Sequence, residues 1–427
     1  MILGQFKDVH FFHTASQGNI YTLVELPIPN GTTKILVASL KREVYCFEFQ
    51  ESSSGSLIPS SKEVLFTYIP NGAEIISMDA FNKSTNSIEI VIGITIIKNS
   101  NDTESRLDTY LNIYSGEDSD ELNIENIAQS CLSVELGYIP YKLLHTYLVI
   151  WNEDELVSKE VVFIISGNDN QVHAYKESSD DHNYKEIEIH EYFPEFTKTP
   201  SPVIWIDIYY HKNFSERVTA FGCECGYVKM FKVDVKNNVL EYNFCTRFGN
   251  YISKVCIVPD KNSPKNCDII NKIRRTEGDK EEEVKLNLIV VNTILPPVIF
   301  HDILRYGLSN YSTLPKMESI GIMTCCEVND VDFDGEKEII MGTNTQEIIL
   351  YKKDSNNTWW LEELKLVTAP VLGIKYVDMT GDGVRDLAIL SMNGVQVLQH
   401  DHNFLQKVLN EKIEILTLPD ISGLKVD

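Results

Sequence analysis

Two short acidic loops carry the residues whose types and spacing best suit metal chemistry. Residues 330–338 place carboxylates at positions 1, 3, 5 and 9 with glycine at position 6, and residues 378–386 repeat this plan with a hydroxyl at position 3. Alternating oxygen ligands around a sharp turn that glycine permits are typical of cages for hard cations such as calcium. The sequence therefore predicts two structural calcium sites. The same residues are also compatible with tight Asx turns that hold no ion.

The two loops differ from the helical EF-hand type of calcium site. Position 12 holds Met341 in the first loop and Ile389 in the second instead of an acid, and the flanking segments have the composition of strands. The loops instead resemble the cation loops between strands of FG-GAP blades in integrin-type propellers. This resemblance implies the following ligands: Asp330, Asp332, Asp334, Glu338 and the backbone carbonyl of Glu336 in the first loop, and Asp378, Thr380, Asp382, Asp386 and the backbone carbonyl of Val384 in the second.

Other catalytic arrangements are weak. Asp330-Val-Asp332 also resembles the nucleophile pair of aspartyl-phosphate hydrolases, but the sequence does not indicate the buried parallel strand and α/β domain that this chemistry needs. Cys223-Glu-Cys225 lacks a second ligand pair at zinc spacing. The sequence contains no phosphate-binding glycine loop and no nucleophile elbow. We therefore predict that the protein is not an enzyme and requires no cofactor.

The elements that must position the acidic loops are strands. Short runs rich in Val, Ile, Tyr and Phe are interrupted every 8 to 15 residues by polar turns, and segments with helical periodicity are scarce. One pattern recurs seven times: an apolar strand, a small residue in most copies, a polar turn, and a second strand that closes on an aromatic or apolar residue. The closing residues are Phe47, Tyr114, Tyr175, Phe231, Phe300, Tyr351 and Leu398.

This recurrence predicts an all-β fold, a seven-bladed β-propeller of the integrin-alpha, FG-GAP-like type, over residues 10–402. The closing residues are 47 to 69 positions apart, which indicates loops of unequal length inserted into a regular unit. Two unrelated β-sandwiches would not need one pattern seven times, and a WD40 array is disfavoured because no tryptophan closes a copy. Residues 403–427 are predicted as a tail with a short helix over 404–416. For an N-terminal strand that closes the last blade, residues 19–24 are the obvious candidate.

Polar segments separate several of the predicted strands. We expect them to be surface insertions, which in propellers can also serve as docking loops. They are residues 50–62, 115–126, 178–191 and 261–285. Charged and apolar residues alternate at helical spacing over 124–136, which predicts one short helix there.

Charge and composition limit the class of partner. The 427 residues include 38 Lys and Arg against 62 Asp and Glu, a formal net charge of −24, while 43% apolar residues suffice for a core. An acidic surface repels phosphate backbones and anionic lipid head groups, so we predict no binding to nucleic acid and no insertion into membranes. Nine scattered cysteines, a start without an apolar signal region and no apolar run of membrane-spanning length predict a cytoplasmic protein.

Specific segments across residues 10–400 resemble the kaptin family. They are Phe66–Pro70, Ala73–Lys83, Val91–Thr95, Tyr110–Tyr114, Ile127–Leu132, Ile165–Asp169, Phe193–Glu195, Gly226–Val228 and the acidic loop that begins at Asp330. The acidic insertion at 279–283 and the tail after Asn403 match the family poorly.

The resemblance implies a non-enzymatic scaffold in a KICSTOR complex, together with an FG-GAP-repeat partner, a very large SZT-type subunit and a further small subunit. This assembly holds the GATOR complex, which activates GTP hydrolysis by Rag GTPases, and so negatively regulates mTOR signalling when amino acids are scarce. The expected location is cytoplasmic and peripheral on the lysosomal membrane through partners. The alternative that the resemblance implies is actin-filament binding at actin-rich cell edges. Because actin is acidic, this alternative needs a local basic face, for example at 272–275.

Overall fold

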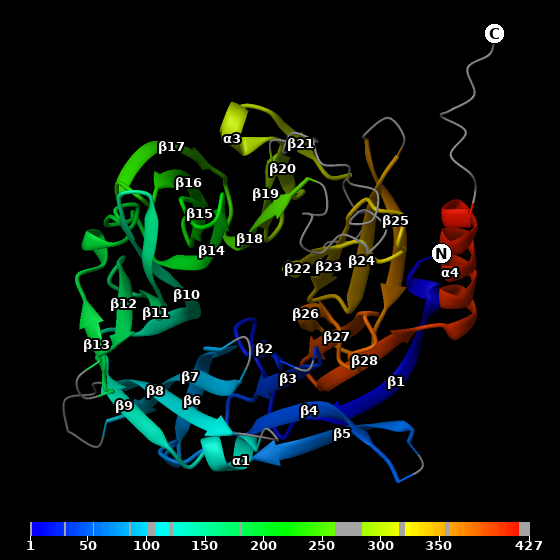
Figure 1. Cartoon of the computed structure of the whole chain (residues 1–427), viewed down its shortest axis with the longest axis horizontal. Coiled ribbons are helices and arrows are strands. Elements are labelled where there is room, and N and C mark those ends of the chain that lie inside the picture. Colours follow the sequence, from blue (N-terminus) through cyan, green and yellow to red (C-terminus); the bar gives the residue numbers. More distant parts are fainter. Residues whose placement is uncertain are drawn as a thin grey trace.

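Seven four-stranded antiparallel sheets stand around a common centre in the computed structural model of the chain (Figure 1). The structure describes residues 2–29, 31–53, 55–84, 87–100, 107–118, 123–179, 182–260, 284–315, 321–354 and 358–417. The predicted seven-bladed β-propeller is confirmed. We number its blades 1 to 7 in chain order.

In six blades the strands follow one another from the centre outward, and the seventh takes its outermost strand from the N-terminal region. Blades 1 to 3 comprise β2 (Leu23–Pro27), β3 (Thr33–Ala38), β4 (Val44–Glu51) and β5 (Leu57–Val64); β6 (Ala73–Asn82), β7 (Ile88–Asn99), β8 (Leu107–Asp118) and β9 (Cys131–Glu135); and β10 (Pro140–Asn152), β11 (Glu155–Gly167), β12 (Val172–Glu177) and β13 (Tyr184–Ile187). Blades 4 and 5 comprise β14 (Val203–His211), β15 (Glu216–Cys223), β16 (Tyr227–Asp234) and β17 (Val239–Arg247); and β18 (Ile252–Pro259), β19 (Leu286–Asn292), β20 (Val298–Phe300) and β21 (Tyr311–Thr313). Blades 6 and 7 comprise β22 (Met323–Asn329), β23 (Glu338–Thr343), β24 (Glu347–Lys353) and β25 (Trp359–Leu366); and β26 (Val371–Val377), β27 (Asp386–Ser391), β28 (Gly394–His400) and β1 (Phe6–His13).

The recurring sequence pattern corresponds to the second and third strands of each blade. All seven closing residues lie on third strands and are at most 3% exposed. The hydrophobic core divides into seven clusters, and each cluster combines residues of two neighbouring blades. A blade therefore buries both of its faces only against its neighbours, which is why the same pattern is needed in every copy.

The strand that closes blade 7 is not the one predicted. β1 pairs with β28, from Phe6 opposite His400 to His13 opposite Gly394. Residues 19–24 instead lead into the innermost strand of blade 1, where Leu23 lies opposite Val37. A register shift between Asp8 and His10 interrupts the apolar alternation of β1, so its sequence does not read as a regular strand.

Several predicted loops contain regular structure. Residues 50–62 include the end of β4 and most of β5, and residues 178–191 include β13 and the 3₁₀ turn η2 (Ile189–Glu191). The helix predicted over 124–136 is right only for α1 (Ile124–Ile127), because β9 follows it. Most of the insertion at 261–285, together with the basic segment 272–275 and the acidic insertion at 279–283, lies outside the described residues.

The other short elements are η1 (Leu3–Gln5) and α3 (Ile303–Tyr306). The predicted C-terminal helix is confirmed as α4 (His402–Thr417), which starts beside the N-terminal strand (Figure 1). Lys7 Nζ forms an ion pair with Asp401 Oδ2 at 2.7 Å. The ring of Phe404 packs against that of Phe333, with 6.2 Å between the ring centroids. No helix in the described part of the chain is long and apolar enough to cross a membrane.

Candidate functional site

The two acidic loops occupy equivalent places in neighbouring blades. Residues 330–337 connect β22 to β23 in blade 6, and residues 378–385 connect β26 to β27 in blade 7. In both cases the acid at position 9, Glu338 or Asp386, is the first residue of the second strand. The flanking segments are strands, as the sequence predicts, and the fold therefore places both loops on the same side of the ring.

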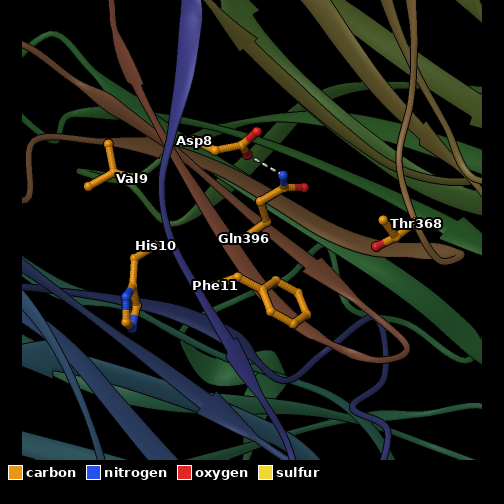
Figure 2. A pocket seen from close by; sticks show the side chains of 6 residues that line it. All are labelled: Asp8, Val9, His10, Phe11, Thr368 and Gln396. Atoms are coloured by element: carbon orange, nitrogen blue, oxygen red, sulfur yellow. Dashed lines mark hydrogen bonds between the residues drawn. The ribbon is translucent and has the colours of Figure 1, made fainter.

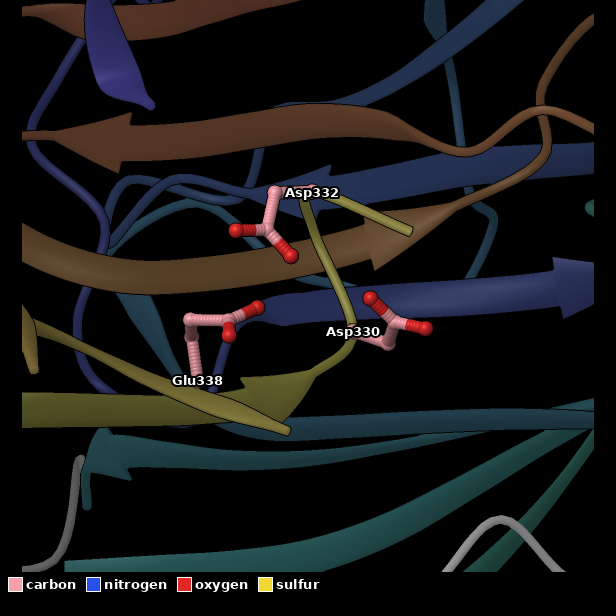
Figure 3. Close-up of side chains that lie close together, drawn as sticks. All are labelled: Asp330, Asp332 and Glu338. Atoms are coloured by element: carbon pink, nitrogen blue, oxygen red, sulfur yellow. The ribbon is translucent and has the colours of Figure 1, made fainter. Parts of the chain in front are cut away.

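The first loop brings three carboxylates together. Ligand oxygens of Asp330, Asp332 and Glu338 all lie within 4.8 Å of one another (Figure 3). The backbone N–H of Gly335 donates to Asp330 Oδ2 at 3.0 Å, and that of Val331 donates to Glu338 Oε2 at 2.9 Å. These bonds hold the carboxylates of Asp330 and Glu338 against the backbone of the loop.

A lysine from a different strand enters this carboxylate cluster. Lys352, on β24, donates from Nζ to the carboxylate of Asp332 and to Asp334 Oδ2 at 2.5 Å. The same ammonium lies 3.5 Å from Glu338 Oε1. An internal positive charge thus lies among the acids that the sequence assigns to calcium and compensates part of their negative charge.

The pKa values of the first loop are shifted because several carboxylates lie close together and are partly shielded from water. Burial raises the pKa of Asp330 to about 6 and that of Glu338 to about 8, and the charges of Asp332 and Asp334 add to both shifts. Burial opposes the charge of Lys352, but its hydrogen bonds to Asp332 and Asp334 outweigh burial and raise its pKa. The cluster is therefore built around the charged ammonium.

The second loop has the same turn geometry without a lysine. Asp378 accepts hydrogen bonds from the backbone N–H groups of Gly381 at 2.7 Å and Gly383 at 2.8 Å. Both glycines have positive φ, 78° and 86°, a conformation that residues with side chains rarely adopt. The N–H of Val384 donates to Asp382 Oδ1 at 2.8 Å. Within the described residues, no three acids of this loop approach as closely as those of the first.

Asp386 is the most buried acid of the second loop, with 3% of its surface exposed. Its Oδ2 atom is buried and has no hydrogen-bond partner among the described residues. Burial raises its pKa to about 7, the charges of Asp382 and Asp378 raise it further, and a hydrogen bond with Gln399 opposes the shift. Thr380 and Val384, the other predicted ligands, are half-buried.

Sequence comparisons place the chain among known proteins. The family model described as "KICSTOR complex protein kaptin" matches residues 6–410. The chain belongs to the kaptin family. The KICSTOR complex protein kaptin of Mus musculus is 35% identical over 395 residues, which cover 91% of this chain and 87% of the mouse protein. Among solved structures, BBS1N, crystallised in complex with ARL6DN and soaked with lead, matches with a TM-score of 0.51 and 8% identity over 92% of this chain and 96% of that one. This last likeness concerns the fold alone.

The kaptin-family propeller contains a second polar centre that the sequence reasoning missed. Each innermost strand carries an ionisable side chain: Glu25, Asp79, Lys142, Asp207, Lys254, Glu327 and Lys375. Lys375 pairs with Glu25 at 3.2 Å. The available signal was a single charged residue inside an apolar strand, as in Ile206-Asp207-Ile208.

An aromatic bridge crosses between non-adjacent blades beside these charges. The hydroxyl of Tyr21, just before β2, donates to the carbonyl oxygen of Ile204 at 2.9 Å, and its ring lies 5.8 Å from that of Trp205. The ammonium of Lys142 lies 4.8 Å from the Trp205 ring centroid. Burial lowers the pKa of Lys142 to about 8. These contacts tie blades 1, 3 and 4 together across the centre.

We expect the ion pair of His145 and Asp79 to make stability depend on pH. His145 Nδ1 lies 2.7 Å from Asp79 Oδ2. Burial disfavours the charged form of both groups. The attraction and hydrogen bond between the two groups outweigh burial, so the pKa of His145 is raised and that of Asp79 is lowered. The pair therefore stabilises the fold above the pKa of Asp79 and loses this contribution as the pH rises through the pKa of His145.

Thermal unfolding at about pH 6 and about pH 8.5, below and well above the ordinary histidine pKa of about 6.5, measures this effect. The wild-type chain should lose on the order of 1 kcal/mol more than the His145→Gln variant between these two conditions. Equal losses in both proteins would show that the pair does not titrate in this way.

A hollow of about 320 Å³ lies on the outer surface of blade 7 (Figure 2). Its lining is Asp8, Val9, His10, Phe11, Thr368 and Gln396. Asp8 accepts a hydrogen bond from Gln396, and the ring of His10 stacks on Phe47 at 5.5 Å. Among the described residues that line the hollow, Asp8 and His10 are the ionisable ones, and these two alone do not form a catalytic or metal-binding set.

Proposed function

We propose that this protein is a non-enzymatic scaffold subunit of a KICSTOR-like complex. In this role it helps recruit the GATOR complex, which activates GTP hydrolysis by Rag GTPases, to lysosomes, and so it negatively regulates mTOR signalling when amino acids are scarce. Its partners are the FG-GAP-repeat subunit and the large SZT-type subunit, with GATOR bound indirectly. The protein is cytoplasmic and reaches the lysosomal surface through these partners.

The observation that carries the proposal is the match to the kaptin family over residues 6–410. It spans all seven blades, so the complete scaffold that displays the docking loops is present. The site chemistry points the same way, because the ionisable groups of the first loop are engaged with one another by ion pairs and turns. A rigid ring with variable connecting loops suits a protein that binds other proteins.

Affinity purification of the tagged full chain from cells tests the complex. We expect the FG-GAP-repeat and SZT-type subunits to be recovered in amounts comparable to the bait, with GATOR subunits at lower yield, and an unrelated acidic propeller to recover none of them. Recovery of no KICSTOR subunit by a bait that shows cooperative unfolding would contradict the proposal.

Signalling in cells that lack the protein separates a scaffold from an enzyme. mTOR activity should persist during amino-acid starvation in these cells, and the wild-type chain should restore its shut-off. The Asp332→Asn variant should restore it equally, since Asp332 belongs to an ion pair rather than to a reaction site. Loss of rescue by a folded Asp332→Asn variant would favour hydrolase chemistry instead.

Actin-filament binding remains the alternative implied by the family resemblance. The formal charge of −24 disfavours contact with acidic actin, and the basic segment 272–275 lies outside the described residues. Cosedimentation with purified filaments at physiological salt decides the question. The scaffold proposal predicts that the purified chain stays in the supernatant.

A further inference from the structure

The two acidic loops differ at one structurally equivalent position on the third strand of their blades. Lys352 follows the closing residue Tyr351 on β24, and Gln399 follows the closing residue Leu398 on β28. Tyr351 lies opposite Ile339, and Leu398 lies opposite Leu387. The following residue therefore lies beside position 9 of the loop in each blade.

The contacts agree with this register. Lys352 Nζ lies 3.5 Å from Glu338 Oε1, and the side chain of Gln399 forms a hydrogen bond with Asp386. The position thus carries a positive charge in blade 6 and a neutral amide in blade 7. A neutral amide leaves the charge of the neighbouring acids uncompensated, whereas an ammonium cancels part of it.

In the first loop, the ammonium lies among the acids, and within the described residues Asp330 Oδ1 and Glu338 Oε1 are buried without a hydrogen-bond partner. The ammonium reaches Asp332, Asp334 and Glu338 at the same time, and these include two of the three acids whose oxygens converge. A divalent ion bound to the same oxygens would lie close to a positive charge, and like charges this close repel strongly in a partly buried place. The lysine and the ion are therefore mutually exclusive.

In the second loop, the charge of the buried acid Asp386 is not compensated by a basic side chain of the described residues. Asp386 Oδ2 is buried without a hydrogen-bond partner in the described part of the chain, and the residue is 3% exposed. The nearest basic residue in sequence, Arg385, is directed elsewhere, since it donates to Asn329 Oδ1 in blade 6 at 2.5 Å. Buried acids of this kind are normally paired or bound to a metal. Carboxylate, hydroxyl and carbonyl oxygens are the ligands that calcium prefers.

We propose that the residue after the closing position decides which loop binds calcium. Lys352 supplies the cation of the loop 330–338 from within the protein, and the loop 378–386, with Gln399 at the same position, takes up one calcium ion. This assignment is independent of the partners of the protein, because it concerns ion binding by the purified chain.

A reciprocal exchange of the two residues tests the proposal, with calcium alone as the probe and isothermal titration calorimetry as the measurement. The wild-type chain should bind one ion, Lys352→Gln two, Gln399→Lys none, and the double variant one. We expect Gln399→Lys to weaken the wild-type site by at least about 100-fold, since ligand charge tunes calcium affinity over several orders of magnitude. Lys352→Met removes the charge without adding a ligand and should also open the first loop.

Melting curves with calcium or with chelator provide a second readout and show that each variant is folded. Lys352→Gln without calcium should melt below the wild type, and calcium should reverse this loss. Binding of two ions by the wild-type chain would overturn the role of Lys352. Failure of the wild type to bind calcium at millimolar concentration, or unchanged binding by Gln399→Lys, would overturn the assignment to the second loop.

Discussion

Replacing Glu195 by alanine should lower the free energy of unfolding by about 3–5 kcal/mol, because it leaves the buried charge of Arg217 without its partner. Arg217 is 1% exposed and Glu195 is 0% exposed. The guanidinium donates from Nε to Oε1 and from Nη2 to Oε2 of Glu195, both at 2.8 Å. This bidentate geometry is the strongest form of the pair, and its loss cannot be repaired by water in a dry interior.

The surroundings of this pair complete its hydrogen bonding. Thr219 Oγ1 donates to Glu195 Oε1 at 2.8 Å, and Arg217 Nη2 donates to the carbonyl oxygen of Tyr192 at 3.1 Å. The guanidinium also lies 4.4 Å from the ring centroid of Phe193. Glu195 lies on the connection between blades 3 and 4 and Arg217 on β15, so the pair fixes how blade 4 joins blade 3.

Denaturant unfolding of three variants of this pair and one control separates the cost of a buried unpaired charge from the cost of a lost contact. Glu195→Ala and Arg217→Met each leave one buried charge and should be destabilised strongly. The double variant Glu195→Leu with Arg217→Met removes both charges and should cost less than either single change. Lys236→Ala, which breaks the exposed pair with Asp154, should cost about 1 kcal/mol or less. Additive losses in the double variant would show that the two charges do not depend on each other.

The architecture was predictable from the sequence because its determinants are local and repeated. The seven closing residues, such as Phe47 and Tyr351, must all fill the space between two blades, so the same chemistry recurs at each interface. The acidic loops were predictable for a similar reason, since Asx turns with glycine leave a spacing that is visible in nine residues.

The contacts that could not be predicted from the sequence join residues that are distant from one another in the chain. Lys352 lies 20 residues from Asp332, and only the register of β23 against β24 brings it into the loop. The Glu195–Arg217 pair and the bridge from Tyr21 to Ile204, 183 residues away, likewise follow from how blades are placed around the ring. Composition and spacing carry no signal for such contacts.

The strand that closes blade 7, β1, could not be predicted because its apolar pattern is irregular. Its position in the ring leads to a second prediction with a large expected effect. Deletion of residues 2–13 should abolish the cooperative unfolding transition of the whole chain. β1 is the fourth strand of blade 7, and it joins the first segment of the chain to the last blade. Without it, β28 becomes an open edge, and the ring loses the element that holds its two ends together.

The energetics support a loss comparable to the usual stability of a domain. Phe6 and Phe12 are 5% and 7% exposed, and Phe12 stacks on Phe47 of blade 1 at 5.9 Å. Removal of each buried aromatic side chain costs about 3–5 kcal/mol, and the ladder with β28 is lost as well. Because domains are stable by only about 5–15 kcal/mol, the truncated chain should have little folded population left.

Calorimetry and size-exclusion chromatography measure this outcome, and two comparisons make it specific. Deletion of residues 403–417 removes most of α4 but no strand, so it should leave a cooperative transition. Lys7→Ala breaks only the partly exposed pair with Asp401 and should change stability by less than about 1 kcal/mol. A synthetic peptide of residues 2–13 should restore the transition when added in excess, since an extended peptide can add to an open sheet edge. If the chain without residues 2–13 melts cooperatively within a few degrees of the full chain, the other blade interfaces hold the ring closed, and β1 covers an edge without closing the fold.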